Sequence, residues 1–371
     1  MKSVKTWILA LIVVSCIQPF ELESERAVER IVIESEITNK KEAYITQISR
    51  TVSGDDHREM VKVTGASVCF EDELGNCYEA KEEKSGIYAT DTSSFIAETG
   101  MSYRLLITLA NGEELVSNYQ TLKAAEPVPP TRLERSTIQA LLGSSIVEET
   151  VVDVIADEGT RSETNYSRYS FVGEYAFRTI QQGSIECFRE EPDEAPPADI
   201  ICYNRESNAG FLNVYSNESF TIGSEVSHTI FVFRYNFKVA RNYNLTITRH
   251  TIDQEAFQFF DQLRRQQEQG GTLFESPPSG IVGNIDNVTN PEGKPLGFFL
   301  TSSESSFRTN ILPSLFRINA KDSVLYPECY PDSIPGRGGP YQLPQPKPFA
   351  FCCDCRLYPG AFTDQPSNWI Q

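Results

Sequence analysis

Histidine is scarce in this 371-residue sequence, which contains only His57, His228 and His250. Zinc sites combine histidines or cysteines at short spacing, and none of the three histidines lies near a cysteine. The sequence also lacks a G-x-S-x-G elbow, a phosphate-binding loop, an H-E-x-x-H motif, a dinucleotide fingerprint and a D-x-D-x-D-G calcium loop. We therefore expect no metal, no cofactor and no enzymatic activity. A carboxylate pair that hydrolyses glycosides stays open as an alternative, because 51 acidic residues are present and their spatial separation is invisible in a sequence.

Positive charge is in deficit. The 33 Lys and Arg residues face 51 Asp and Glu residues, and the net charge is −18. Nucleic-acid binding needs basic side chains that displace counterions from phosphates, so this composition argues against a nucleic-acid partner. It also opposes adsorption to an anionic membrane surface, so any membrane attachment should come from a lipid.

Long hydrophobic runs are missing as well. The apolar run WILALIVV at residues 7–14 is far shorter than the roughly 20 residues of a membrane-spanning helix. Two lysines precede this run, and Ser15 and Cys16 follow it directly. This order is typical of a lipoprotein signal peptide over 1–15. We expect Cys16 to carry fatty acyl chains such as palmitate and residues 16–28 to form a polar tether from the bilayer. The alternative is an ordinary signal peptide with an incidental cysteine.

Short alternating runs between turn residues predict an immunoglobulin-like β-sandwich over residues 29–123. Asn111-Gly112 is the strongest hairpin signal, and residues 73–76 (ELGN) predict a second hairpin. Tyr103 either pins a neighbouring loop through its hydroxyl or is an ordinary core aromatic. The proline-rich stretch at 124–132 predicts a stiff linker and a domain boundary.

Residues 133–371 predict a larger β-rich domain, again sandwich-like. Aromatic residues alternate along 229–237, which indicates a core face more than a sugar-stacking stripe, and 243–247 is the expected returning strand. One amphipathic helix is predicted over 253–269, with Asp253 as its N-cap and Ile252 contacting Phe257 as a hydrophobic staple. The proline- and glycine-rich tail at 326–371 predicts a wrapping segment held by crosslinks.

Eight cysteines follow Cys16, an even number that favours disulfides in an exported protein. Cys69 and Cys77 are an even number of residues apart across the 73–76 turn, so a local disulfide is plausible. The C-x-x-C in the tail could also be a zinc knuckle or a redox pair, but nearby prolines disfavour the helix start that a redox motif uses. The disulfide candidates are Cys69, Cys77, Cys187, Cys202, Cys329, Cys352, Cys353 and Cys355.

Residues 251–299 and the tail CCDCR at 352–356 resemble an uncharacterised lipoprotein family, domain of unknown function 4249. The layout of the family also fits three other segments: the lipobox, which is the Val-Val-Ser-Cys sequence at residues 13–16, the small sandwich ending in NGEELVSNYQTL, and the PVPP linker. The resemblance implies an outer-membrane lipoprotein of Gram-negative bacteria, often encoded beside a TonB-dependent receptor, and it implies no catalytic residue. By position, it implies that Cys202, Cys329, Cys352 and Cys355 are shared with relatives, while Cys69, Cys77, Cys187 and Cys353 are additions.

The functional expectation is a lipid-anchored accessory of a TonB-dependent receptor that assists nutrient capture, facing the cell exterior. The alternatives are an adhesion or envelope-structural protein and an extracellular hydrolase. Ligand identity is open at this point.

Overall fold

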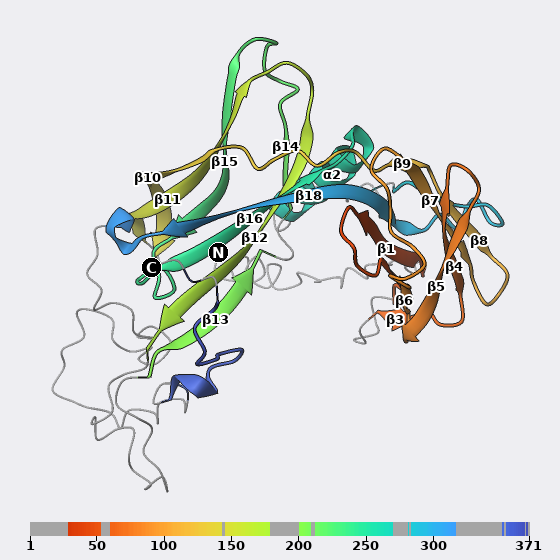
Figure 1. The fold of residues 1–371 in the computed structure, drawn as a ribbon, viewed down its shortest axis with the longest axis horizontal. Helices are drawn as coiled ribbons and strands as arrows, with labels where there is room; N and C mark the ends of the chain where they lie inside the picture. The colour runs from red at the N-terminus through yellow and green to blue at the C-terminus, as the bar shows by residue number, and fades with distance from the viewer. Residues whose placement is uncertain are drawn as a thin grey trace, which may run out of the picture.

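A computed structural model describes residues 29–52, 60–142, 145–178, 200–208, 212–269, 281, 283–316, 351, 354–367 and 369. These residues form a mainly β protein with one long α-helix, which confirms the expected fold class (Figure 1). A sheet of 15 strands runs through two β bodies, and a separate sheet of three strands completes the second body.

The first β body, at the right of Figure 1, contains the strands β1 to β9. The sheet follows the order β1-β2-β6-β5-β4-β7-β8, with β3 beside β2 and β9 beside β7. Ile33 and Ile37 of β1 are fully buried in one core together with Leu105 of β7, because alternate residues of each strand point inward. The strands are β1 (Ile31–Thr38), β2 (Ile45–Arg50), β3 (Val61–Lys62), β4 (Ser67–Asp72), β5 (Cys77–Lys84), β6 (Ile87–Thr90), β7 (Ser102–Thr108), β8 (Glu114–Ser117) and β9 (Gln120–Thr121).

Both expected hairpins are present. Gly112, with φ of 86°, turns β7 into β8, and Gly75, with φ of 84°, turns β4 into β5. Only glycine adopts this left-handed conformation at little cost, which is why these turns could be recognised in the sequence.

Buried tyrosines tie loops to the first body through their hydroxyls. The Tyr103 hydroxyl accepts a hydrogen bond of 2.8 Å from the Glu98 backbone N–H. The side chain is also only 3 % exposed, so Tyr103 packs in the core and holds the neighbouring loop through its hydroxyl. Tyr44 accepts from the Ala97 N–H at 2.9 Å, and Tyr88 accepts from the Ala66 N–H at 3.0 Å.

The second β body packs two layers face to face around one core. One layer is the three-stranded sheet β10-β11-β15, and the other is the β12, β13, β14, β16 and β18 end of the large sheet. Val154 of β11, Phe231 of β15 and Leu245 of β16 lie in the shared core. The strands are β10 (Thr131–Leu142), β11 (Ser145–Thr160), β12 (Tyr166–Phe177), β13 (Cys202–Ser207), β14 (Asn213–Ser216), β15 (Glu225–Arg234), β16 (Tyr243–Thr251) and β18 (Leu296–Ile311), followed by the 3-10 turn η1 (Pro313–Phe316).

The expected return of the chain after 229–237 was wrong in one respect. β16 does not pair with β15; it crosses to the other layer and pairs with β12 and β18. The aromatic alternation itself is core, as expected, because Phe233 of β15 meets Tyr243 of β16 edge-on across the layers at 5.4 Å. An inward aromatic face fits either a hairpin or a crossover, so the pattern alone could not separate them.

β18 belongs to both bodies. Its first half pairs in parallel with β1, from Val32 opposite Leu296 to Thr38 opposite Ser302. Its second half pairs antiparallel with β16, and the blue ribbon in Figure 1 spans both bodies. β17 (Ile285–Asn287) likewise pairs with β8 of the first body. The first body is therefore completed by residues that follow the second in sequence, and 124–132 alone does not divide them in space.

Residues 122–130 form no helix or strand, and they lie along β18. The hydroxyls of Thr301, Ser303 and Ser305 donate to the backbone carbonyls of residues 121, 123 and 126. Because these three residues alternate along β18, one face of the strand holds the linker by its carbonyl groups. The linker is thus a docked segment.

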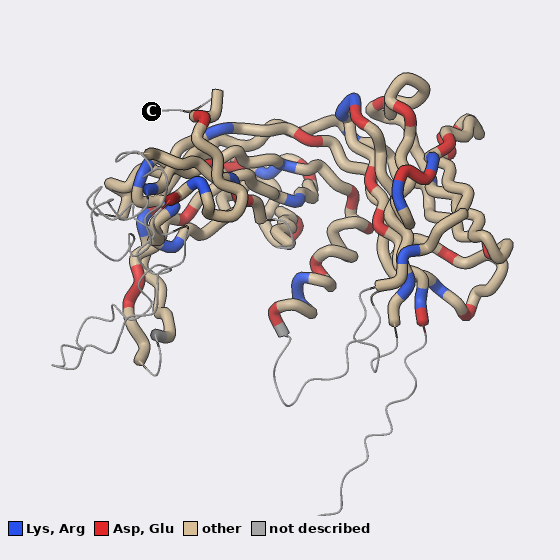
Figure 2. The backbone as a smooth tube through the Cα atoms, turned by 90° about the horizontal axis from the view of Figure 1, so that it is seen from below, with Lys and Arg blue, Asp and Glu red and all other residues tan. Residues whose placement is uncertain are grey.

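The helix α2 (Gln254–Gln269) lies where expected, and Figure 2 shows it between the two bodies. Asp253 caps it, since its Oδ1 accepts from the Ala256 N–H at 2.7 Å. Ile252, Ala256 and Phe259 pack in a small cluster with Phe298 of β18, and Phe257 lies against it. The helix therefore buries its apolar stripe against its own chain.

A disulfide ties the C-terminal region to the second body. Cys202 of β13 is joined to Cys355 of the 3-10 turn η4 (Cys355–Leu357), and both are buried. Tyr203 pairs with Phe362 in a β-bridge beside this disulfide. This segment of the tail packs on the second body as the crosslinked tail was expected to do.

Candidate functional site

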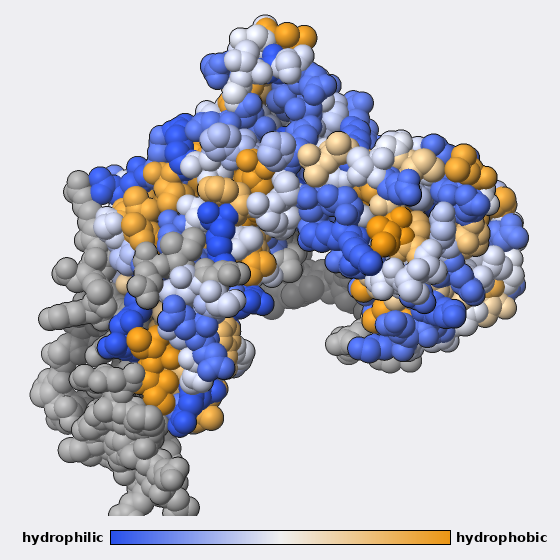
Figure 3. All heavy atoms as spheres, viewed as in Figure 1, coloured by the Kyte–Doolittle hydropathy of each residue, from blue (hydrophilic) through white to orange (hydrophobic). Residues whose placement is uncertain are grey.

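A cleft of about 730 Å³ lies between the first body, α2 and β18. β1 and β2 form one wall, α2 and the start of β18 form another, and Arg168 of β12 reaches in from the second body. Figure 3 shows the molecule indented between the two bodies. Pockets of this size bind small organic ligands, so this cleft is the candidate site.

The period of a β-strand explains why β1 contributes to the cleft. Ile33 and Ile37 point into the first core, whereas Glu34 and Glu36 point away from it and line the cleft. One strand thus builds both a hydrophobic core and an acidic cleft wall.

The opposite wall is apolar. Phe259, Phe260 and Leu263 of α2 face the cleft with Phe298 of β18. Phe259 stacks on Phe298 at 4.9 Å, and the Arg168 guanidinium lies over the Phe260 ring at 5.3 Å, a cation–π distance. These contacts hold the aromatic rings and the arginine in fixed positions.

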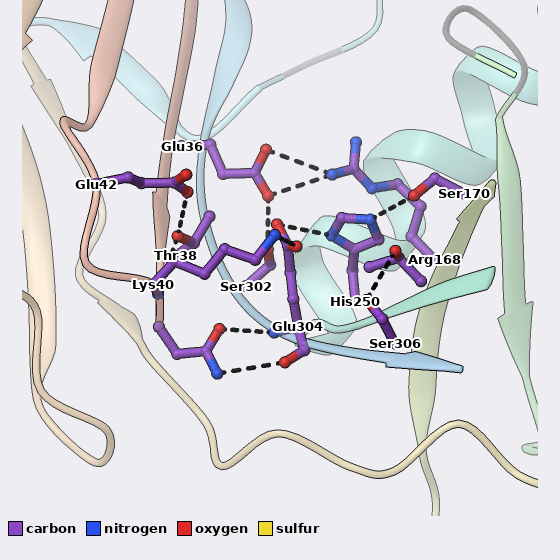
Figure 4. A network of polar contacts seen from close by, with 12 residues as sticks. Glu36, Thr38, Lys40, Glu42, Arg168, Ser170, His250, Ser302, Glu304 and Ser306 are labelled. Atoms are coloured by element: carbon purple, nitrogen blue, oxygen red, sulfur yellow. Dashed lines mark hydrogen bonds and ion pairs between the residues drawn. The ribbon is translucent and has the colours of Figure 1, made fainter. Parts of the chain in front are cut away.

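Glu36 and Arg168 join the two bodies at the polar end of the cleft (Figure 4). Arg168 Nη2 lies 3.2 Å and 3.4 Å from the two carboxylate oxygens of Glu36. Ser302 donates to Glu36 Oε1 at 2.5 Å. The ion pair is partly exposed, so its main effect is to orient both side chains, with at most about 1 kcal/mol of stabilisation.

Glu304 is the centre of a second group at this end. Its carboxylate pairs with Lys40, and its backbone N–H donates to Asn39 Oδ1 at 2.8 Å. His250 Nδ1 lies 3.6 Å from Glu304 Oε1, which is too long for a hydrogen bond, while His250 Nε2 lies 2.9 Å from Ser170 Oγ. Burial lowers the pKa of His250 to about 3, aided by the positive charges of Arg168 and Lys40, so the imidazole is neutral at pH 7.

A buried arginine holds a separate polar cluster inside the second body. Arg249, whose side chain is 4 % exposed, pairs with Glu126 of the linker at 2.5 Å and with Glu158 of β11 at 3.3 Å. Its Nε donates to Ser167 Oγ at 2.9 Å, and the Tyr169 hydroxyl donates to Glu158 at 2.8 Å. Every charge in this cluster has an internal partner, so it stabilises the packing of the linker and the two layers.

The structure brings together four of the sequence-selected cysteines, in two pairs. Cys69 and Cys77 are joined by a disulfide. Cys69 pairs with Glu79 and Cys77 with Glu71 across the hairpin, so the two cysteines are diagonal neighbours on one face. Cys202 pairs with Cys355. Cys16, Cys187, Cys329, Cys352 and Cys353 lie outside the described residues.

The histidines do not meet in the described part of the chain. His228 stacks on Tyr215 in the second body, His250 lies at the cleft, and His57 is outside the described residues. Within the described ranges no three His, Cys, Asp or Glu side chains are arranged to hold a metal ion.

The cleft could not be read directly from the sequence. Its residues come from segments more than 250 positions apart, such as Glu36 and Glu304. The one available signal was the alternation of carboxylates with isoleucines along 31–38, which marks a strand whose outer face is acidic.

In the described residues no helix is both long and apolar enough to cross a membrane. A family model described as a domain of unknown function, DUF4249, matches residues 17–308. That range covers the first body, most of the second and every wall of the cleft, and it ends within β18, before the cysteine-rich tail. No curated protein matches the chain.

Proposed function

The chain belongs to the DUF4249 domain family, and from this membership and the cleft we propose a lipid-anchored binding protein of the outer membrane. It works beside a TonB-dependent receptor and holds a nutrient in the cleft between its β bodies. It acts by binding, without catalysing a reaction.

The anchor rests on the N-terminal pattern. A short apolar run followed by Ser15 and Cys16 supports export and acylation. Two described disulfides, Cys69–Cys77 and Cys202–Cys355, are typical of proteins that fold in an oxidising compartment. Two or three acyl chains would hold the protein on the membrane permanently, since each buried methylene contributes roughly 0.8 kcal/mol.

The observation that carries the proposal is the cleft of about 730 Å³ at the junction of the two bodies. β18 is hydrogen-bonded to β1 on one side and to β16 on the other, so a single strand sets the spacing of the walls. A cleft held open in this way loses little freedom when a ligand enters, which favours binding.

Co-purification tests the partner. Native membranes are extracted with mild detergent, the protein is purified through a C-terminal tag, and the co-purifying proteins are identified by mass spectrometry. We expect a TonB-dependent receptor in stoichiometric amount. Recovery of the protein alone in repeated extractions would favour the adhesion or structural alternative.

A matched pair of variants tests the anchor. Cys16→Ser removes the acylated thiol and should release the protein from the membrane fraction. Ser15→Ala keeps a small residue before the cysteine and should leave the protein anchored. Membrane retention of Cys16→Ser would contradict acylation at this position.

A further inference from the structure

The cleft carries more negative than positive charge. Glu34, Glu36, Glu42 and Glu304 line it, while Arg168 is the cation among its lining residues. This imbalance suggests which ligands the site accepts, and the inference that follows rests on the binding role proposed above.

Two of these carboxylates already have cationic partners. Glu36 is paired with Arg168, and Glu304 is paired with Lys40. The same pairs neutralise the two cations, so neither is available to attract an anionic ligand. A ligand carboxylate would have to displace an existing ion pair.

The other two carboxylates are open. Glu34 is exposed and forms no hydrogen bond or ion pair with a described side chain. Glu42 is also exposed, and its partner among the described residues is the neutral hydroxyl of Thr38, which donates at 2.7 Å. Neither carboxylate therefore has a cationic partner among the described residues, and both are open to an incoming group.

Apolar side chains lie beside these carboxylates. Ile45 of β2 is 47 % exposed at the cleft, and Phe260, Leu263 and Leu296 are partly exposed in the opposite wall. Burying such surface against the apolar body of a ligand favours binding. The cleft thus combines an apolar wall with two carboxylates, Glu34 and Glu42, that have no cationic partner among the described residues.

We infer that the cleft binds an organic cation: an apolar body packs against Ile45 and the α2 wall while an ammonium or guanidinium group meets one of the two open carboxylates, Glu34 or Glu42. The cation belongs either to a free amine or to a Lys or Arg side chain of a peptide, since both present the same chemistry. Neutral and anionic compounds with the same body should bind more weakly.

Isothermal titration of the full-length protein with three compounds of one shape tests this inference. 4-Phenylbutylamine is cationic, 4-phenylbutanol is neutral and 5-phenylvalerate is anionic. We expect the amine to bind up to about fivefold more tightly than the alcohol, as for a charge contact at an exposed site, and the acid to bind most weakly. Equal affinities for amine and alcohol, tightest binding of the acid, or no heat with the amine at millimolar concentration would each overturn the inference.

Variants locate the charge contact. Glu34→Gln with Glu42→Gln should remove the preference for the amine and leave alcohol binding unchanged. Glu79→Gln with Glu83→Gln changes the net charge equally on the exposed face of β5, away from the cleft, and should keep the preference. An unchanged preference in the cleft variant would show that these carboxylates do not hold the cation.

A fourth compound tests whether the cation comes from a free amine or from a peptide side chain. N-acetyl-Phe-Arg-amide presents the same cation from a peptide, and a tighter fit than the amine identifies peptides as the source. Weaker binding of the peptide than of the amine identifies free amines.

The inference and the proposed function fail in different ways. Receptor co-purification without amine binding removes only the cation site. Amine binding without any co-purifying receptor removes only the receptor partnership.

Discussion

Gly297 of β18 lies against the backbone carbonyl of Ile33 in β1 so closely that a side chain at this position would overlap the oxygen. Its φ of 107° is also a conformation that L-residues rarely adopt. The junction of the two β bodies is therefore built on a position where no side chain fits.

Gly297→Ala should lower the free energy of unfolding by more than about 2 kcal/mol, because it adds an overlap to an unfavourable φ. Gly223→Ala is the matched control, with φ of 87° and open space around the added methyl group, and should cost about 1 to 2 kcal/mol. Urea unfolding followed by fluorescence measures both. Equal costs would contradict the close approach of β1 and β18.

Arg249→Ala should destabilise the protein by about 3 to 5 kcal/mol, since it leaves the carboxylates of Glu126 and Glu158 without their partner. Arg205→Ala should cost no more than about 1 kcal/mol, because its side chain is 64 % exposed and Glu174 keeps Arg308. Chemical unfolding of the two variants side by side makes the comparison. A small effect at Arg249 would show that water replaces it.

The two described disulfides should differ in their contribution. Replacing Cys202 and Cys355 by alanine opens a loop with a sequence separation of 153, and the chain-entropy relation gives about 5 kcal/mol. Replacing Cys69 and Cys77 opens a separation of 8 and should cost about 2.5 kcal/mol. Thermal unfolding under non-reducing conditions ranks the two double variants, and the reverse order would contradict this account.

Acid should destabilise the protein through its buried histidines. Burial lowers the pKa of His228 to about 4, with a further contribution from Arg249, and lowers that of His250 to about 3. In the unfolded chain both titrate near pH 6.5, so between pH 6.5 and 4 the unfolded state binds more protons. The contribution of these two histidines to stability is therefore fully present above pH 6.5 and is lost as the pH drops toward 4.

Urea midpoints at pH 7 and pH 5 test this dependence. The wild type should lose stability between the two pH values, and His228→Gln with His250→Gln should lose less. Because other titrating groups are common to both proteins, the difference between them isolates the histidines. An equal loss in both would exclude these two groups as the cause.

Local features were predictable from the sequence. The turns at Gly75 and Gly112 and the cap at Asp253 depend on residues within four positions, and they appear as expected. The diagonal Cys69–Cys77 disulfide follows from hairpin register for the same reason.

Long-range features were not predictable. The parallel pairing of β1 with β18 places Val32 opposite Leu296. The alternation of residues within a strand shows which side chains face the core, but it does not show which other strand lies beside it. The cleft depends on that pairing, because it brings Ser302 and Glu304 beside the acidic face of β1. The prediction that β16 returns beside β15 was wrong for a similar reason. A strand with an inward aromatic face can be followed by a strand of the same sheet or of the opposite sheet, and the sequence pattern is the same in both cases.

The sharing of β18 also determines when the first body can complete its fold as the chain is synthesised. Synthesis from the N-terminus delivers β1 first, yet its neighbouring strand segment at residues 296–302 emerges only after the chain from β10 to β17. Until then β1 presents an open edge, which is a site for mispairing with other chains. A chaperone that binds exposed strands would have its greatest effect during this interval, and slowing synthesis after β1 would increase aggregation of the nascent protein.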